Sequence, residues 1–163
     1  MKDREKIVYK VFEELGIKYE KRIHPPVYTC EESRKYTSDL RGSHCKNLFL
    51  RNKKGNNHYL VVVEESKTLN IKDFEKRINE KNLSFASEKR MMKYLGLTPG
   101  SVSIFGLIND KEKKVIVYLD EDIFTKGYIN FHPNINTATL NISIDDFKKY
   151  LKWCRNEINM LNI

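Results

Sequence analysis

The sequence predicts an α+β fold, in which helices surround a central, mostly antiparallel, mixed and curved β-sheet. Segments with helical spacing of apolar residues alternate with short apolar runs joined by polar hairpin connections, and this mixture is typical of the α+β class. The chain has 163 residues, which is the usual size of one domain with its own core. We therefore expect residues 1–163 to form a single domain.

The N-terminal segment predicts an amphipathic helix followed by a strand. Its apolar residues recur at helical spacing up to Gly16: Ile7, Val8, Val11, Phe12 and Leu15. A strand over residues 19–23 should follow this helix. The next segment, His24-Pro25-Pro26, should end the strand, because proline has no N–H to donate to a sheet.

A second helix and a hairpin are expected next. Thr29 and Glu32 have the spacing of a capping box, in which each side chain accepts a hydrogen bond from the other's free N–H at a helix start. This helix should extend to Ser38. The apolar runs at 47–52 and 59–64 are separated by a short polar stretch, which predicts two strands of a hairpin.

Two further helices are predicted in the middle of the chain. Phe74 and Ile78 mark a short helix by their spacing. Ser87 is a favourable N-cap for another helix, and Gly96 is a favourable C-cap because glycine readily takes the left-handed conformation.

The last third of the chain predicts a second hairpin, a late strand and a closing helix. The runs 102–108 and 115–119 should pair around a polar turn, and 139–142 should form the late strand. Ser143 should begin the closing helix. The apolar side of that helix is formed by four residues: Phe147, Tyr150, Leu151 and Cys154.

The composition argues against a membrane or secreted protein. Charged residues make up 32% of the chain, and no segment approaches the roughly 20 apolar residues of a membrane span. The N-terminal residues carry charges of both signs and lack the apolar core of a signal peptide. We expect a cytoplasmic protein.

Neither a metal nor another cofactor is expected. The three cysteines, Cys30, Cys45 and Cys154, form no close pair, so neither a disulfide framework nor a Cys-x-x-Cys site is indicated. The four histidines show no ligand spacing. The formal net charge of +8 favours a phosphate-rich partner, although many basic proteins bind no nucleic acid.

The segment from Gly96 to Asp110 combines glycines and a proline with a run that otherwise reads as a buried strand. At the entrance of such a strand, Gly100 could aim successive backbone N–H groups at a carbonyl or a water, since glycine permits close approach. The simpler interpretation is a turn that leads into a strand, with Gly96 ending the preceding helix.

Three segments together carry a family resemblance. They contain Lys-Asn-Leu-Phe-Leu at 46–50, Leu-Thr-Pro-Gly-Ser-Val at 97–102 and His-Pro-x-x-Asn-Thr-Ala-Thr at 132–139. In this order they resemble the aminoacyl-tRNA deacylases of the YbaK/ProX type, relatives of the editing domain of bacterial prolyl-tRNA synthetases. The resemblance runs from about Ile7 to about Trp153.

The resemblance implies a catalytic site without a protein nucleophile. An aminoacyl ester is already activated, so a positioned water and a stabilised oxyanion suffice for its hydrolysis. The backbone at Gly100 and Ser101 would orient ester and water, and the ribose hydroxyl of the substrate would assist. Lys46 matches the family lysine that holds the terminal adenosine phosphate or the aminoacyl end, whereas the residue pattern alone also fits a solvated lysine at a strand end.

The resemblance also implies substrate-binding residues. His132 would line the aminoacyl pocket, with Asn136, Thr137 and Phe105 as further candidates. Without the family, His132 would be read as a structural histidine bonded to backbone.

One position departs from the family. The family loop usually reads Gly-x-x-x-Pro-Phe, and this chain has Ile104 in place of the proline. Isoleucine keeps an N–H donor and leaves the backbone freer than proline would. We therefore expect a looser loop than in relatives.

Within the family, the free-standing enzymes that clear alanine from proline tRNA are the best match. The expected partner is tRNA(Pro) carrying alanine, and prolyl-tRNA synthetase is a further candidate partner. Two alternatives remain at this point: a Cys-tRNA(Pro) deacylase, and a tRNA-binding or regulatory module that has lost efficient hydrolysis. A pocket that accepts proline cannot reject smaller side chains by clash, which explains why a second, small-side-chain site is needed at all.

Overall fold

The computed structural model describes residues 2–163; Met1, the first residue of the predicted domain, lies outside the described residues. Eight strands form one sheet, in the order β1-β7-β6-β2-β3-β5-β8, with β4 paired to β2. The strands are β1 (Glu20–Ile23), β2 (Ser43–Arg51), β3 (His58–Glu64), β4 (Ser84–Phe85), β5 (Val115–Asp120), β6 (Tyr128–Phe131), β7 (Ala138–Ser143) and β8 (Ile158–Leu161).

The sheet is mixed, and β2 joins its two halves. The pairs β1–β7, β6–β7, β2–β3 and β2–β4 are antiparallel, while β2–β6, β3–β5 and β5–β8 are parallel. The start of β2 pairs with β6 through Ser43 and His44, and the rest of β2 pairs with β3 from Cys45 onwards. The predicted α+β class with a mixed, mainly antiparallel sheet is therefore confirmed.

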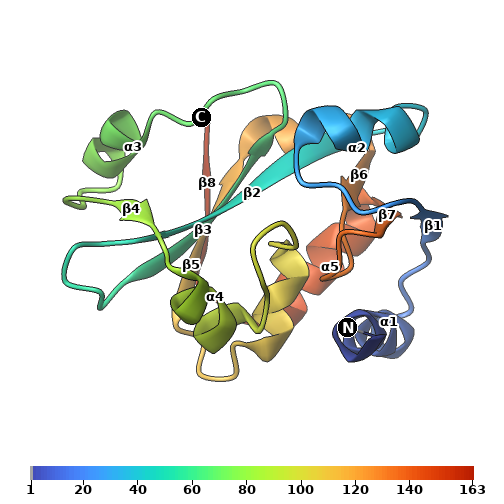
Figure 1. Cartoon of the computed structure of the whole chain (residues 1–163), viewed down its shortest axis with the longest axis horizontal. Coiled ribbons are helices and arrows are strands. Elements are labelled where there is room, and N and C mark those ends of the chain that lie inside the picture. The colour runs from blue at the N-terminus through green and yellow to red at the C-terminus, as the bar shows by residue number, and fades with distance from the viewer. Residues whose placement is uncertain (1) are drawn as a thin grey trace.

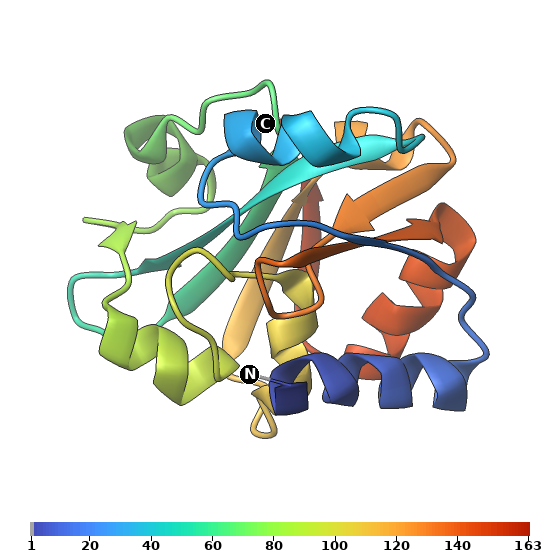
Figure 2. The ribbon, with the colours of Figure 1, turned by 45° about the vertical axis from the view of Figure 1, so that its right-hand side comes forward.

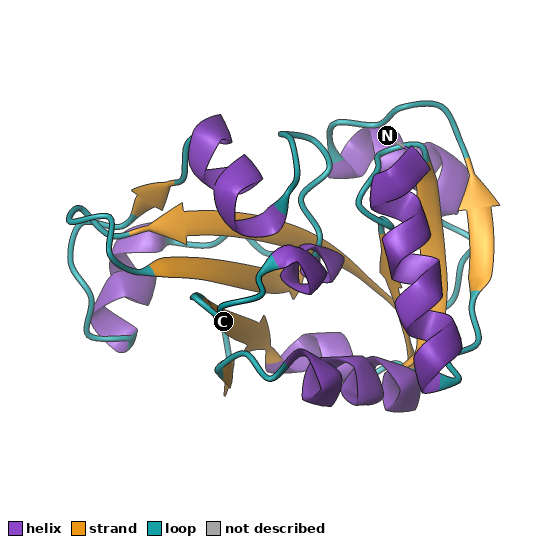
Figure 3. Cartoon of the chain, turned by 90° about the horizontal axis from the view of Figure 1, so that it is seen from below, coloured by secondary structure: helices purple, strands orange, loops and turns teal. Residues whose placement is uncertain are grey.

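Helices lie on both sides of this sheet (Figure 1). They are α1 (Lys2–Leu15), α2 (Cys30–Thr37), α3 (Ile71–Arg77), α4 (Glu88–Leu95) and α5 (Ile144–Cys154), with 3₁₀ helices η1 (Ile104–Asn109) and η2 (Glu121–Phe124). Figure 2 shows α2 along one side of β2, with α4 and the segment leading to η1 on the other side. Figure 3 shows α1 running in front of the strands and meeting α5 at its lower end.

The core divides according to the alternation of side chains along the strands. In β3, Leu60 and Val62 join the large cluster under α1, α4, η1 and α5, whereas Val61 and Val63 join a smaller cluster under α3. Successive strand residues point to opposite faces, and here both faces are covered. This double coverage accounts for the continuous apolar run in the sequence.

The predicted helix caps are present. Thr29 Oγ1 accepts from the N–H of Glu32 at 3.1 Å, and Ser143 Oγ accepts from the N–H of Asp146 at 3.1 Å. Gly96 ends α4 in the left-handed conformation with φ 67°. The Glu32 carboxylate, however, accepts from the N–H of Tyr28 rather than from that of Thr29, so only half of the predicted capping box forms.

The predicted strand over 102–108 is wrong, and so is its hairpin with the next strand. Residues 104–109 form η1, which begins where Ser103 Oγ accepts from the N–H of Phe105 at 3.1 Å. All residues from 104 to 107 are buried, so their apolar run carries no periodicity that separates strand from helix. β5 instead pairs with β3 and β8, both in parallel.

Candidate functional site

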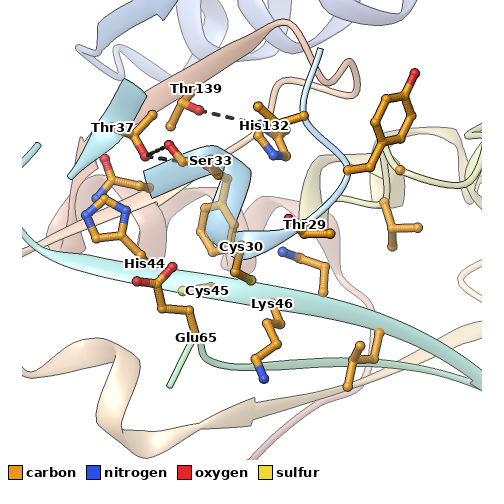
Figure 4. Close-up of a pocket in the computed structure, with 18 residues that line it drawn as sticks. Thr29, Cys30, Ser33, Thr37, His44, Cys45, Lys46, Glu65, His132 and Thr139 are labelled. Atoms are coloured by element: carbon orange, nitrogen blue, oxygen red, sulfur yellow. Dashed lines mark hydrogen bonds between the residues drawn. The ribbon is translucent and has the colours of Figure 1, made fainter. Parts of the chain in front are cut away.

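A cavity of about 310 Å³ opens where the two halves of the sheet diverge. Most of its lining comes from four segments: residues 27–37 before and within α2, residues 44–48 of β2, the loop around Gly100, and the end of β6 with His132; Glu65 and Thr139 complete it. β2 forms one wall because it leaves β6 after His44 and continues beside β3. Segments far apart in the chain thus meet at one place (Figure 4).

Three of the predicted site residues line this cavity: Lys46, Gly100 and His132. In Figure 4 the ring of His132 lies above and the stem of Lys46 below, with Cys30 and Cys45 between them in this view. A cation from β2 and an imidazole from the residue that follows β6 therefore border the same space.

Lys46 lies within β2 opposite Val63 and is half-buried. Its ammonium donates a hydrogen bond to the backbone carbonyl of Lys67, in the loop that follows β3. An ammonium has three N–H donors, and this bond uses one of them. Lys46 is thus held at the rim of the cavity with donor capacity left for an anionic or carbonyl oxygen.

His132 is held in one tautomer. Its Nδ1 lies 2.8 Å from the carbonyl oxygen of Ala138, so Nδ1 carries the proton and donates it. Burial lowers the pKa of His132 and outweighs that hydrogen bond, and the neighbouring His24 ring lowers it further. The neutral ring therefore presents Nε2 as an acceptor.

Gly100 brings the loop close to the α2 entrance. Its φ is +85°, and a Cβ at this position would lie 2.9 Å from Cδ1 of Tyr28. A side chain would collide with that ring as well as strain the backbone. Glycine at position 100 is thus needed first of all to let this loop pack against Tyr28.

Ile104 and Asn47 link the loop to β2. The N–H of Ile104 donates to Oδ1 of Asn47 at 3.1 Å, and the carbonyl of Ile104 accepts from the hydroxyl of Tyr150 at 2.8 Å. Both backbone polar groups of Ile104 are therefore engaged, and a proline at this position could not make the first of these bonds. Because Asn47 lines the cavity and its Oδ1 accepts this bond, its NH₂ group is the end left to face a ligand.

Four predicted site residues do not line the cavity. Ser101 is buried, and its N–H donates to the carbonyl of Thr98 at 3.1 Å, so this N–H is not available to a substrate. Phe105 is wholly inside the core, where its ring packs edge-on against Phe12, Phe131 and Tyr150.

Asn136 and Thr137 support the cavity wall from behind. Asn136 Nδ2 donates to the carbonyl of Val27 at 3.1 Å, and the N–H of Val27 donates back to the carbonyl of Asn136 at 3.2 Å. The carbonyl of Thr137 accepts from the N–H of His24 at 3.0 Å. Their contacts fix the segment before α2 rather than reach into the cavity.

The comparisons with known proteins identify the family of this chain. A model of the aminoacyl-tRNA editing domain matches residues 24–150, which include every wall of the cavity. The chain belongs to the aminoacyl-tRNA editing family of deacylases.

Relatives in this family match the chain over most of its length. "Prolyl-tRNA editing protein ProX" of Acetoanaerobium sticklandii is 41% identical over 150 residues, 92% of each chain. "Prolyl-tRNA synthetase associated domain-containing protein 1" of Mus musculus is 34% identical over 152 residues, 91% of this chain and 89% of the relative. A crystal structure described as a candidate trans-editing enzyme for prolyl tRNA synthetase has a TM-score of 0.71 at 18% identity and covers 97% of this chain and 96% of its own.

Several residues that line the cavity of this chain were not predicted from the sequence: Thr29, Cys30, Ser33, His44, Cys45 and Glu65. Burial raises the pKa of both cavity thiols, and the carboxylate of Glu65 adds to the effect, so neither thiol is an activated nucleophile. The Glu65 carboxylate itself pairs with Arg34 at 2.9 Å. The capping spacing at Thr29 could have marked this helix start as a cavity wall, whereas the cysteines carried no signal.

No helix in residues 2–163 is both long enough and apolar enough to cross a membrane.

Proposed function

We propose that this chain hydrolyses the ester of Ala-tRNA(Pro) in trans. The observation that carries the proposal is the placement of Lys46 and His132 around one cavity closed by the Gly100 loop, in a chain 41% identical to a prolyl-tRNA editing protein. The net charge of +8 supports a tRNA partner, because phosphates attract a basic protein regardless of sequence. The site of action would then be the cytoplasm, where charged tRNA occurs.

In this proposal each cavity group has one task. The ammonium of Lys46, at the rim, binds the terminal adenosine phosphate or the ester carbonyl through charge-assisted hydrogen bonds. Nε2 of His132 accepts a hydrogen bond from the α-ammonium of the aminoacyl group. The NH₂ group of Asn47 donates to the substrate while its Oδ1 stays bonded to Ile104.

Water is the nucleophile in this mechanism, and the ribose hydroxyl of the substrate assists it. Two observations support the choice: the thiols lining the cavity have raised pKa values, and the ester is already activated. The backbone near Gly100 and Val102 then orients the ester. The N–H of Ser101 has no part, since it is used by Thr98.

The decisive experiment charges tRNA(Pro) separately with alanine, cysteine and proline and follows the loss of each amino acid. We expect fast loss of alanine and retention of proline. Loss of cysteine alone would replace the proposal by Cys-tRNA(Pro) deacylation. Binding of tRNA without loss of any amino acid would instead identify a non-catalytic tRNA-binding module. A mixture with prolyl-tRNA synthetase would show whether that enzyme, as supplier of the mischarged tRNA, changes the rate.

A further inference from the structure

Asp120, at the end of β5, is a buried carboxylate outside the cavity. It is 0% exposed and accepts three hydrogen bonds: from the N–H of Glu64 at 3.1 Å, from the N–H of Asp122 at 3.1 Å and from the ammonium of Lys67 at 3.0 Å. Burying a carboxylate is costly unless it is paired and hydrogen-bonded, and here both of its oxygens are used. Its partners lie at the end of β3, in the loop that follows and in η2.

Lys67 connects this carboxylate to the cavity. Its side chain bonds to Asp120 and also to Asp122 at 2.7 Å, and its own N–H donates to the carbonyl of Glu64 at 3.0 Å. The backbone of Lys67 is thereby held directly through its N–H and indirectly through its side-chain ammonium. Its carbonyl oxygen is the group that accepts the hydrogen bond from the ammonium of Lys46.

We propose that Lys67 is a positioning residue for the reaction: its ion pair with Asp120 fixes the Lys67 carbonyl, which holds the Lys46 ammonium at the cavity rim. A lysine side chain has four flexible bonds, and holding its end before the substrate arrives removes an ordering cost from the reaction. This inference rests on the proposed function, because it assigns Lys67 to the same site.

The first test is a double-mutant cycle on single-turnover hydrolysis of Ala-tRNA(Pro). We expect Lys67→Met to lower the rate about tenfold, equivalent to about 1.4 kcal/mol, and Lys67→Arg to restore most of it through bonds to the same two carboxylates. In a Lys46→Ala protein, Lys67→Met should change the rate no further. Lys21→Met is the matched control, because it breaks an ion pair with Glu5 elsewhere in the chain and should leave the rate unchanged.

The folding of each variant is measured by thermal melting. Lys67→Met leaves the Asp120 carboxylate without its cation, so the double variant Lys67→Met/Asp120→Asn removes the unpaired charge and keeps the test valid if the single variant melts early. An equal slowing by Lys67→Met in the wild-type and Lys46→Ala proteins would overturn the proposal, as would an unchanged rate in a folded Lys67→Met protein.

A second readout does not depend on tRNA. Acetylation of Lys46 by an N-hydroxysuccinimide ester, followed by peptide mass spectrometry, reports how firmly its nitrogen is held. We expect Lys67→Met to speed acetylation of Lys46 several-fold and to leave that of Lys149 unchanged. If all aminoacyl-tRNAs are stable but this change appears, the proposed function fails while the link from Lys67 to Lys46 stands; if acetylation is unchanged, the link itself is wrong.

Discussion

Replacing Ile104 by proline restores the residue usual in the family loop, and the structure predicts a loss of stability. Proline removes the N–H that donates to Asn47 Oδ1 at 3.1 Å. The fixed φ of proline is itself acceptable, because Ile104 is the first residue of η1, where proline is commonly tolerated. The penalty therefore comes from the lost hydrogen bond and from packing.

The size of the penalty follows from three costs and one gain. The net hydrogen bond contributes about 1 kcal/mol, and the half-buried Asn47 oxygen left without its donor adds about 1 kcal/mol. Ile104 is 0% exposed, so losing roughly one methylene of buried surface costs about 1 kcal/mol more. The lower entropy of the unfolded chain returns about 0.7 kcal/mol. A net loss near 2 kcal/mol corresponds to a fall in melting temperature of about 4–8 °C for a chain of this size.

Ile104→Val is the matched control, since it removes one methylene and keeps the N–H. Asn47→Ala removes the same hydrogen bond from its other end. We expect Ile104→Pro to melt below Ile104→Val and to hydrolyse Ala-tRNA(Pro) more slowly, because the Asn47 amide loses the bond that orients it. In an Asn47→Ala background, the extra slowing by proline should disappear. Equal melting of the proline and valine variants would refute the hydrogen-bond argument, and faster hydrolysis by the proline variant would show that stiffening of the loop outweighs the loss of the bond.

Four further predictions concern charge and protonation. Lys46→Ala should slow deacylation roughly 10- to 100-fold, the value of one charged hydrogen bond, with unchanged melting; an unchanged rate would remove Lys46 from the mechanism. Because burial lowers the pKa of His132, the rate should stay flat as the pH falls to about 6.5 and decline only below that value, and a decline centred above pH 7 would contradict a neutral imidazole. Burial, with Arg90 and Arg51 nearby, lowers the pKa of His58 to about 4, so the unfolded chain binds a proton between pH 6.5 and 4 that the folded chain does not. In urea unfolding, the free energy of unfolding should then fall by about 3 kcal/mol between pH 6.5 and pH 4 because of this group. The His58→Gln protein should lack most of this fall. Affinity for tRNA(Pro) should fall linearly with log salt concentration; a salt-independent affinity would mean that the net positive charge is not used on the phosphates.

The helix starts were predictable from the sequence because a cap is a local event. Ser87 and Ser143 each bond to an N–H three residues ahead, within reach of any short segment. The run 104–108 was not predictable, because it is enclosed on all sides and a 3₁₀ helix and a strand then show the same apolar pattern. β8 was missed because its four residues pair with β5, a partner about 40 positions earlier in the chain.

The candidate site was likewise only partly predictable from the sequence. Lys46, Gly100 and His132 were identified by resemblance and meet at one cavity, although their meeting depends on strand pairings that no local pattern encodes. Ser101 was misplaced because its N–H closes a turn onto Thr98, and Phe105 because a motif residue can serve the core instead of the site.

A hydrogen bond from Ile104 to Asn47 links two of the motif segments, the one at 46–50 and the glycine loop. The Oδ1 of Asn47 is bonded to the one N–H that the usual family proline would lack. With proline at position 104, the oxygen of Asn47 would need another donor or a water, and its amide could turn. Ile104 thus acts across 57 positions: its N–H bonds to the Oδ1 of Asn47 and leaves the NH₂ group as the end that can face the cavity.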